Sequence, residues 1–172
     1  MDLDLLVPVA FGGQTYEKLT LRDPTAADFE YAATAATPVG VTIQLIARAA
    51  SVDVGVVRGL CARDLRRIEA QMAAPTVPAI VDGDLRLSDP VKLPDGSQIS
   101  ALKLREPTAG DLERSANASS GVHSNILLVA FASDASPAVV RMLKKCDFDA
   151  AVAYLSDFLA DGPGIGASQS PG

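Results

Sequence analysis

The sequence predicts an α+β fold that is mostly helical and is built from two homologous units. The twelve residues LTLRDPTAADFE at 19–30 return as LKLREPTAGDLE at 102–113. Each copy follows a segment with hairpin turn residues and alternating hydrophobicity, and each precedes stretches with helical spacing. We therefore expect each unit to be a β-hairpin followed by three or four short helices.

The repeat extends well beyond the twelve-residue motif. A shift of 83 positions aligns the chain with itself without a gap from about residue 8 to residue 64. A shared helix start would account for the motif alone, whereas the register holds far past it. Recurring residues include Val56 with Val139, Val57 with Val140, Arg58 with Arg141 and Leu60 with Leu143. This pattern predicts a tandem duplication in which each copy is one structural unit.

The predicted division of the chain follows the repeat. The first unit covers residues 1–74 and the second covers residues 91–160. Residues 75–90 between them are rich in Pro, Gly and Asp, which is typical of a linker, and one short strand is expected near 84–87. Residues 161–172 are mostly Gly, Pro and Ser without periodicity, so we expect a disordered tail.

Each unit is expected to begin with a β-hairpin. The dipeptides Gly12-Gly13 and Asp95-Gly96 can adopt the positive φ angles that tight hairpin turns need. The strand after each turn alternates apolar and polar residues, as in KLTL at 18–21. Pro24 then ends that strand in the first copy.

The repeated motif has the composition of a helix start. Thr25 and Thr108 occupy N-cap positions, and Asp28 and Asp111 follow three residues later, which is a capping-box arrangement with Asp in place of Glu or Gln. The preceding arginines, Arg22 and Arg105, are expected to pair with these carboxylates or with Glu30 and Glu113.

Four helices are predicted in each unit. Short helices are expected at about 26–36 and 109–118, and breaks at 38–40 and 120–121 separate them from apolar helices at 41–50 and 124–133. The apolar helices are hydrophobic on nearly every side, so we expect them to be buried. Third helices are predicted at about 54–61 and 137–145, and a last helix after Asp64 and after Asp147.

Composition and charge exclude several classes of partner. The net charge of −6 opposes binding to phosphate backbones, so no nucleic-acid partner is expected. It equally opposes docking on an anionic membrane. The longest apolar runs are too short to span a bilayer, and the N-terminus lacks the basic flank of a signal peptide. Two cysteines without an export signal are expected to be free thiols in a reducing cytoplasm.

The sequence predicts no catalytic, cofactor-binding or metal-binding residues. Cys61, Cys146 and His123 lack neighbouring ligands at metal-site spacing, and no nucleophile motif surrounds them. Asp28 and Glu30 are two residues apart, so on a helix their carboxylates point in different directions. With apolar faces and no reactive cluster, the pattern favours a binding protein that uses no cofactor.

The repeated unit resembles a known family. Its strand ending L-x-L-R-[DE]-P-T-x-x-D-[FL], followed by an Ala-rich helix, an apolar helix and a closing helix, resembles the tail assembly chaperones of long-tailed bacteriophages. The nearest resemblance is to the small myophage proteins encoded between the tail tube and tape measure genes. The resemblance covers most of the chain, once per repeat, whereas the usual member carries one unit.

The resemblance implies a non-enzymatic chaperone that acts in the host cytoplasm and is absent from the mature virion. Its expected partner is the tape measure protein, whose long apolar helices it would keep soluble until the tail tube polymerises. Tail tube protein and further copies of the chain are additional candidate partners. The alternatives are a structural tail or head–tail connector component of the virion, or an enzyme with a site dispersed over both units.

Apolar residues on the last helices are the candidates for contact with such a partner, because an amphipathic helix can cover a client helix. The same residues are equally compatible with an ordinary core. They are Leu65, Ile68, Met72, Val152, Leu155 and Phe158.

Overall fold

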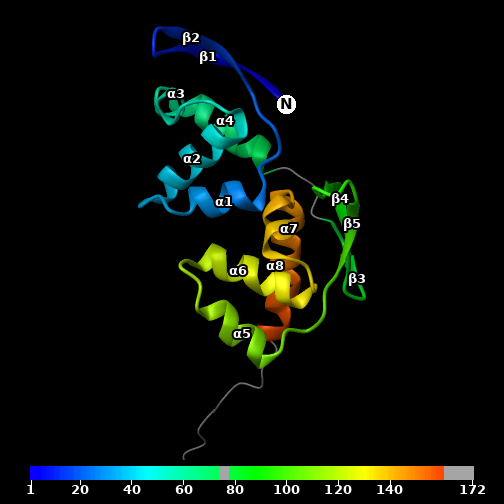
Figure 1. Cartoon of the computed structure of the whole chain (residues 1–172). Coiled ribbons are helices and arrows are strands. Elements are labelled where there is room, and N and C mark those ends of the chain that lie inside the picture. Colours follow the sequence, from blue (N-terminus) through cyan, green and yellow to red (C-terminus); the bar gives the residue numbers. More distant parts are fainter. Residues whose placement is uncertain (74–77, 161–172) are drawn as a thin grey trace, which may run out of the picture.

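The computed structural model describes residues 1–73 and 78–160 and contains two units of the same construction. The first unit comprises β1 (Asp2–Phe11), β2 (Gln14–Thr20), α1 (Ala26–Ala32), α2 (Pro38–Ala50), α3 (Val54–Arg58) and α4 (Ala62–Met72). The second comprises β3 (Ile80–Val81), β4 (Asp84–Lys92), β5 (Gln98–Lys103), α5 (Ala109–Ala116), α6 (Gly121–Ala132), α7 (Pro137–Met142) and α8 (Lys145–Ala160) (Figure 1). The predicted α+β fold, with a hairpin and then helices in each unit, is confirmed.

The two hairpins share a register but differ by one residue in their turns. Leu3 lies opposite Leu19 in the first ladder, and Leu85 lies opposite Leu102 in the second. Leu3 and Leu85 are 82 positions apart, whereas Leu19 and Leu102 are 83 apart, because the second turn is one residue longer. The shift of 83 positions therefore aligns the two units correctly only after the hairpin turn. Before residue 12 the correct shift is 82, so that part of the predicted alignment is wrong by one residue.

Each hairpin has a shift in its strand pairing, and a buried carboxylate accepts a hydrogen bond from the backbone at that shift. The ladders shift register after Asp4 and after Arg86. At these places the backbone N–H of Leu6 donates to Asp64 Oδ2 at 2.9 Å, and that of Ser88 donates to Asp147 at 3.1 Å. Both carboxylates are fully buried. They thus accept from strand N–H groups where the ladder shifts, and join the last helix of each unit to its first strand.

The last helices begin before these aspartates, not after them as predicted. α4 starts at Ala62 and α8 starts at Lys145, so Asp64 and Asp147 lie in the first turn. A carboxylate in the first turn is stabilised by the helix dipole. The sequence pattern indicates a helix start at each aspartate. It does not reveal that each carboxylate also binds a distant strand.

The capping boxes formed by the repeated motif are confirmed. Thr25 Oγ1 accepts from the backbone N–H of Asp28 at 3.3 Å, while Asp28 Oδ2 accepts from the N–H of Thr25 at 2.9 Å. Thr108 and Asp111 repeat this arrangement. The helices that follow end at Ala32 and Ala116, and are thus shorter than predicted.

Pro38 begins a helix where the sequence predicted a break. Thr37 caps α2 through a 3.0 Å bond from the N–H of Gly40, and Pro38 takes the first helical position. Proline fits there because that position has no intrahelical N–H bond to lose. In the second unit Ser120 caps α6 in the same way. The third helices, α3 and α7, end at Arg58 and Met142, earlier than predicted.

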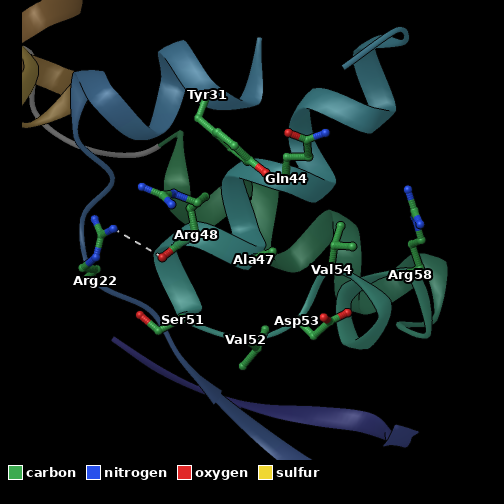
Figure 2. A pocket seen from close by; sticks show the side chains of 10 residues that line it. All are labelled: Arg22, Tyr31, Gln44, Ala47, Arg48, Ser51, Val52, Asp53, Val54 and Arg58. Carbon is green, nitrogen blue, oxygen red and sulfur yellow. Dashed lines mark hydrogen bonds between the residues drawn. The ribbon is translucent and has the colours of Figure 1, made fainter. Parts of the chain in front are cut away.

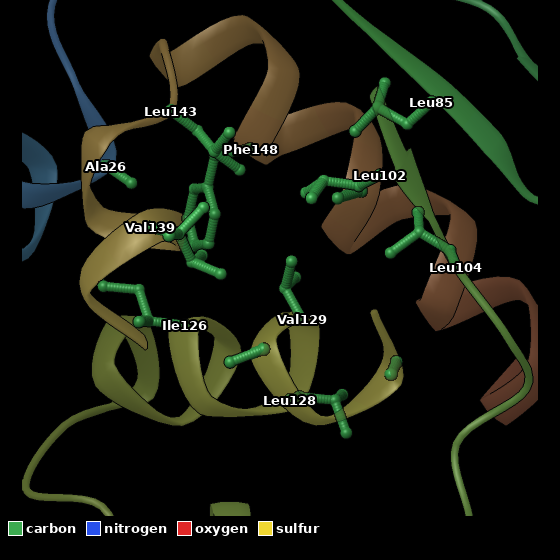
Figure 3. Close-up of a cluster of buried hydrophobic side chains, with 14 of the residues drawn as sticks. Ala26, Leu85, Leu102, Leu104, Ile126, Leu128, Val129, Val139, Leu143 and Phe148 are labelled. Atoms are coloured by element: carbon green, nitrogen blue, oxygen red, sulfur yellow. The ribbon is translucent and has the colours of Figure 1, made fainter. Parts of the chain in front are cut away.

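Each unit has its own hydrophobic core. The first contains Leu3 and Leu19 from the hairpin with Ile46, Val57 and Ile68 from the helices. The second core is larger, and Figure 3 labels ten of its residues. They are Ala26, Leu85, Leu102, Leu104, Ile126, Leu128, Val129, Val139, Leu143 and Phe148. The second halves of α6 and α2 contain buried residues as predicted, whereas the first halves of both helices do not.

The seam between the units is made by α1, which packs on the second unit beside α7 and α8 (Figure 1). Ala26 is fully buried and belongs to the core of the second unit. Its backbone N–H donates to Leu143 O at 2.9 Å, and the N–H of Lys145 donates to Pro24 O at 2.8 Å. Two backbone hydrogen bonds and an apolar anchor are therefore among the contacts that hold the units together.

The segment between the units contains more strand than predicted. β4 begins at Asp84 and continues to Lys92, so the expected short strand near 84–87 is the start of the second hairpin. The division at 75–90 stays a prediction. The tail predicted at 161–172 lies outside the described residues.

Gly83 offers a test of the second hairpin. Its φ is +81°, and a Cβ there would lie 2.2 Å from Leu104 O. We expect Gly83→Ala to lower the free energy of unfolding by about 1–3 kcal/mol, because backbone strain adds to a clash with main chain. Urea unfolding followed by circular dichroism measures this loss.

Gly96→Ala is the matched control. Gly96 has a similar φ of +85°, but a Cβ there would meet nothing within 4 Å. Its loss should be smaller than that of Gly83→Ala. Equal losses for the two variants would show that the contact with Leu104 contributes nothing.

Candidate partner-binding surface

Five of the six residues predicted to contact a partner lie in or against the two cores. Ile68 and Leu155 are each 0% exposed. Leu65, Met72 and Val152 are half-buried and pack against the cores of their units. In this conformation Ile68 and Leu155 present no surface to another molecule. The binding role assigned to these residues stays a prediction.

Phe158, the sixth residue, lies at an exposed apolar end of α8. It is 37% exposed, and its neighbour Leu159 is 49% exposed. The half-buried ring of Tyr154 packs edge to face against Phe158 with centroids 5.2 Å apart. We refer to Tyr154, Phe158 and Leu159 as the α8 tip. Its rings are held by each other, which lowers the entropy lost when a partner covers them.

The α8 tip exists because α8 is longer than its counterpart. α4 ends at Met72, and the equivalent residue in the second unit is Leu155. α8 continues to Ala160, past Leu155, which is the last buried residue of the helix among residues 145–159. The helical spacing of Leu155 and Leu159 was visible in the sequence, but Tyr154 was missed because it lies to the side of that face.

The buried carboxylates of the capping boxes accept hydrogen bonds from arginines. Arg22 donates to both oxygens of Asp28 at 2.6 and 3.0 Å, and Arg48 Nε donates to Oδ1 at 3.1 Å. Burial raises the pKa of Asp28, but the bonds from Arg22 and Thr25 outweigh burial and hold that pKa well below its usual range. This carboxylate is therefore ionised and fully bonded, which suits a structural role.

Asp111 repeats this arrangement in the second unit. Arg105 and Arg114 each donate to it at 2.7 Å. The bonds from Arg105 and Thr108 lower the pKa of Asp111 well below its usual range. Of the two pairings expected for Arg22 and Arg105, the one with the capping aspartates is found, and Glu30 pairs with Arg141.

A cavity of about 540 Å³ lies beside α2 in the first unit (Figure 2). Arg22 and Arg48 line it but are already bonded to Asp28. Asp53 also lines it and caps α3 through the N–H of Gly55. Arg48 lies over the ring of Tyr31 at 5.0 Å. The charged groups of Arg22, Arg48 and Asp53 are thus used within the unit, whereas the lining residue Gln44 has a buried Oε1 without a hydrogen-bond partner among the described residues. The lining residues form no arrangement of acid, base and nucleophile.

The residues that most often bind metals or act as nucleophiles are dispersed. Cys61 lies 3.2 Å from Asp64 Oδ2, and His123 Nδ1 lies 3.0 Å from Ser119 Oγ. Within residues 1–73 and 78–160, no group of three or more His, Cys, Asp or Glu side chains is arranged to hold a metal ion. In the same residues, we find no helix with the length and apolar character needed to cross a bilayer.

Comparison with known proteins identifies the family. A family model described as phage tail assembly chaperone proteins, E, or 41 or 14, matches residues 2–75 and again residues 84–160. No curated protein and no solved structure matches the chain. The two matches cover the two units seen in the fold. The chain therefore belongs to the family of phage tail assembly chaperones and carries the family's unit twice.

Proposed function

We propose that this chaperone binds the tape measure protein and keeps it soluble until the tail tube polymerises around it. The observation that carries the proposal is the exposed apolar α8 tip in a member of a tail assembly family. A tape measure protein is a long helical client with an apolar face, and such a face aggregates unless it is covered. An aromatic anchor on a helix end covers it through contacts one helical turn apart.

The chemistry of the α8 tip supports this role. Large aromatic side chains provide most of the energy at protein interfaces, and Tyr154 with Phe158 supplies a pre-packed pair. The chain also carries a net charge of −6, which keeps a complex with an apolar client in solution by repulsion between complexes. We further propose that the protein acts in the host cytoplasm and leaves before the particle is complete.

Co-expression with the tape measure protein of the same phage tests the proposal. We expect soluble client to be recovered only with the wild-type chain, and to fall at least tenfold with Phe158→Glu/Leu159→Glu. Two buried negative charges at the interface remove the apolar contact and oppose its desolvation. The readout is the soluble fraction of the client after centrifugation.

The matched control is Leu6→Glu/Val7→Glu on β1, whose side chains are 51% and 49% exposed. It adds the same charge at similar exposure, and should leave the soluble client unchanged. A client that stays insoluble with the wild-type chain, or equal losses in both variants, contradicts the proposal. Detection of the chain in purified virions would favour the structural-component alternative.

A further inference from the structure

Two surfaces pack against each other where the units meet, one from each unit. Because the units are repeats, each of these surfaces has an equivalent on the other unit, and within the described residues neither equivalent is covered by another unit. The seam is formed by α1 of the first unit and by the end of α7 with the start of α8 in the second. By the repeat, α5 is equivalent to α1, and the end of α3 with the start of α4 is equivalent to the end of α7 with the start of α8. We define the α5 face as Pro107, Ala109 and Glu113, and the α3–α4 face as Arg58, Leu60 and Ala62 together with Ile43 of α2.

The residues of these two faces are more exposed than their counterparts in the seam. Ala26 is 0% exposed, whereas its equivalent Ala109 is exposed. Leu143 is 1% exposed, whereas its equivalent Leu60 is half-buried. Ile126 is fully buried, whereas Ile43 is half-buried. The difference is the one expected if the seam covers these positions in one unit and nothing covers them in the other.

The charges that close the seam are present on both free faces. Arg141 donates to Glu30 through Nε at 2.7 Å and through Nη2 at 3.0 Å. The equivalent residues are Arg58 and Glu113, and both side chains are exposed. A two-bond arginine–carboxylate pair has a fixed geometry, so the same pair at equivalent positions favours the same docking.

The backbone groups of the seam are also repeated. Ala26 N–H and Pro24 O bond to Leu143 O and Lys145 N–H across the seam. Their equivalents are Ala109 N–H, Pro107 O, Leu60 O and Ala62 N–H. Within residues 1–73 and 78–160, neither Ala109 N–H nor Ala62 N–H has a hydrogen-bond acceptor. Both are groups at helix starts, which need a partner from outside the helix.

We propose that copies of this chain join head to tail, with the α5 face of one copy docked on the α3–α4 face of the next. Each new contact repeats the seam, with Glu113 of one copy on Arg58 of the next. The two faces differ from one another and lie on different units, so the contact is heterologous and does not close by two-fold symmetry. Such a contact gives a ring of three or more copies or an open row of units, and every junction between copies is alike.

The junction between copies is weaker than the seam within one chain. Lys144 pairs with Asp23 at 2.8 Å across the seam, but the equivalent of Lys144 is Cys61. Lys145 lies over the ring of Phe29 at 4.8 Å, and its equivalent is Ala62. The intermolecular contact therefore retains the arginine–glutamate pair and the apolar anchor but lacks these two lysine contacts. Assembly is thus expected to depend on concentration.

Light scattering coupled to size exclusion tests the inference on the full chain without any client. We expect the mass to rise with concentration from 17.8 kDa to beyond twice that value. Glu113→Arg alone and Arg58→Glu alone should each remain at 17.8 kDa, because each places like charges at the junction. A mixture of the two variants should assemble again, since the arginine introduced in one variant then meets the glutamate introduced in the other.

The controls are Glu17→Arg and Arg86→Glu, which make the same charge changes at exposed sites on the hairpins. They should assemble as the wild type does. A wild-type mass of one chain at every concentration, a plateau at two chains, or single variants that assemble normally would each overturn the inference. Because no client is present, these outcomes are independent of whether the chain binds the tape measure protein.

Discussion

Replacing Phe148 by alanine is expected to lower the free energy of unfolding of the second unit by about 3–5 kcal/mol. Phe148 is 1% exposed and is among the largest side chains of that core. It lies beside Leu143 and Val139 (Figure 3). Its removal leaves a cavity that surrounding helices fill only partly. A unit of this size has roughly 4–11 kcal/mol of stability in total, so the variant is expected to be marginally folded.

The measurement is urea unfolding at 25 °C, and the control is Phe158→Ala in the same helix. Phe158 is 37% exposed, so its truncation should cost less than about 1 kcal/mol. This pair of variants separates core from partner surface on a single helix. A large loss for Phe158→Ala, or a small one for Phe148→Ala, would contradict the placement of the two rings.

Asp28→Ala is expected to cost about 3 kcal/mol in the first unit. The substitution removes the acceptor for Arg22, Arg48 and the N–H of Thr25. This expected loss of stability lies at the lower end of the range for breaking a buried ion pair. The reason is that the side chains of Arg22 and Arg48 are 47% and 48% exposed, so water can solvate them when Asp28 is removed. Urea unfolding measures this loss. Asp2→Ala, which removes an exposed carboxylate, is the control and should change little.

The contribution of Asp28 should depend on pH in a defined direction. Because its pKa is lowered in the folded state, its stabilisation is fully present above the unfolded carboxyl value of about 4 and is lost as the pH falls below it. The difference in stability between the wild type and Asp28→Asn should therefore be constant from pH 7 to 5 and shrink at lower pH. A difference that stays constant down to pH 2 would show that the ionised form is not the one bound.

Local interactions were the part of the fold that the sequence could predict. Thr25 and Asp28 are three residues apart, so their capping box follows from spacing alone. Gly13 and Gly96 have φ angles of +80° and +85° at the hairpin turns, as their positions indicated. In each case the residues that interact are neighbours in the chain, and the local rule needs no knowledge of packing.

Long-range interactions could not be predicted. Glu30 and Arg141 are 111 residues apart, and the sequence offered Arg105 and Arg22 as equally good partners for acidic residues. Asp64 bonds to Leu6 across 58 residues, a contact that depends on where β1 shifts register. Periodicity placed Leu155 and Phe158 on the apolar face of one helix. It could not show that the rest of the second unit covers Leu155 and leaves Phe158 exposed.

The proposed binding of the tape measure protein to the α8 tip is tested most directly by site-specific crosslinking. The photoreactive residue p-benzoylphenylalanine is placed at position 158 or, as a control, at position 6, and each variant is co-expressed with the tape measure protein and irradiated. We expect a crosslink to the tape measure protein from position 158 and none from position 6. A client that remains bound but crosslinks only from position 6, or equally from both, would contradict the proposal.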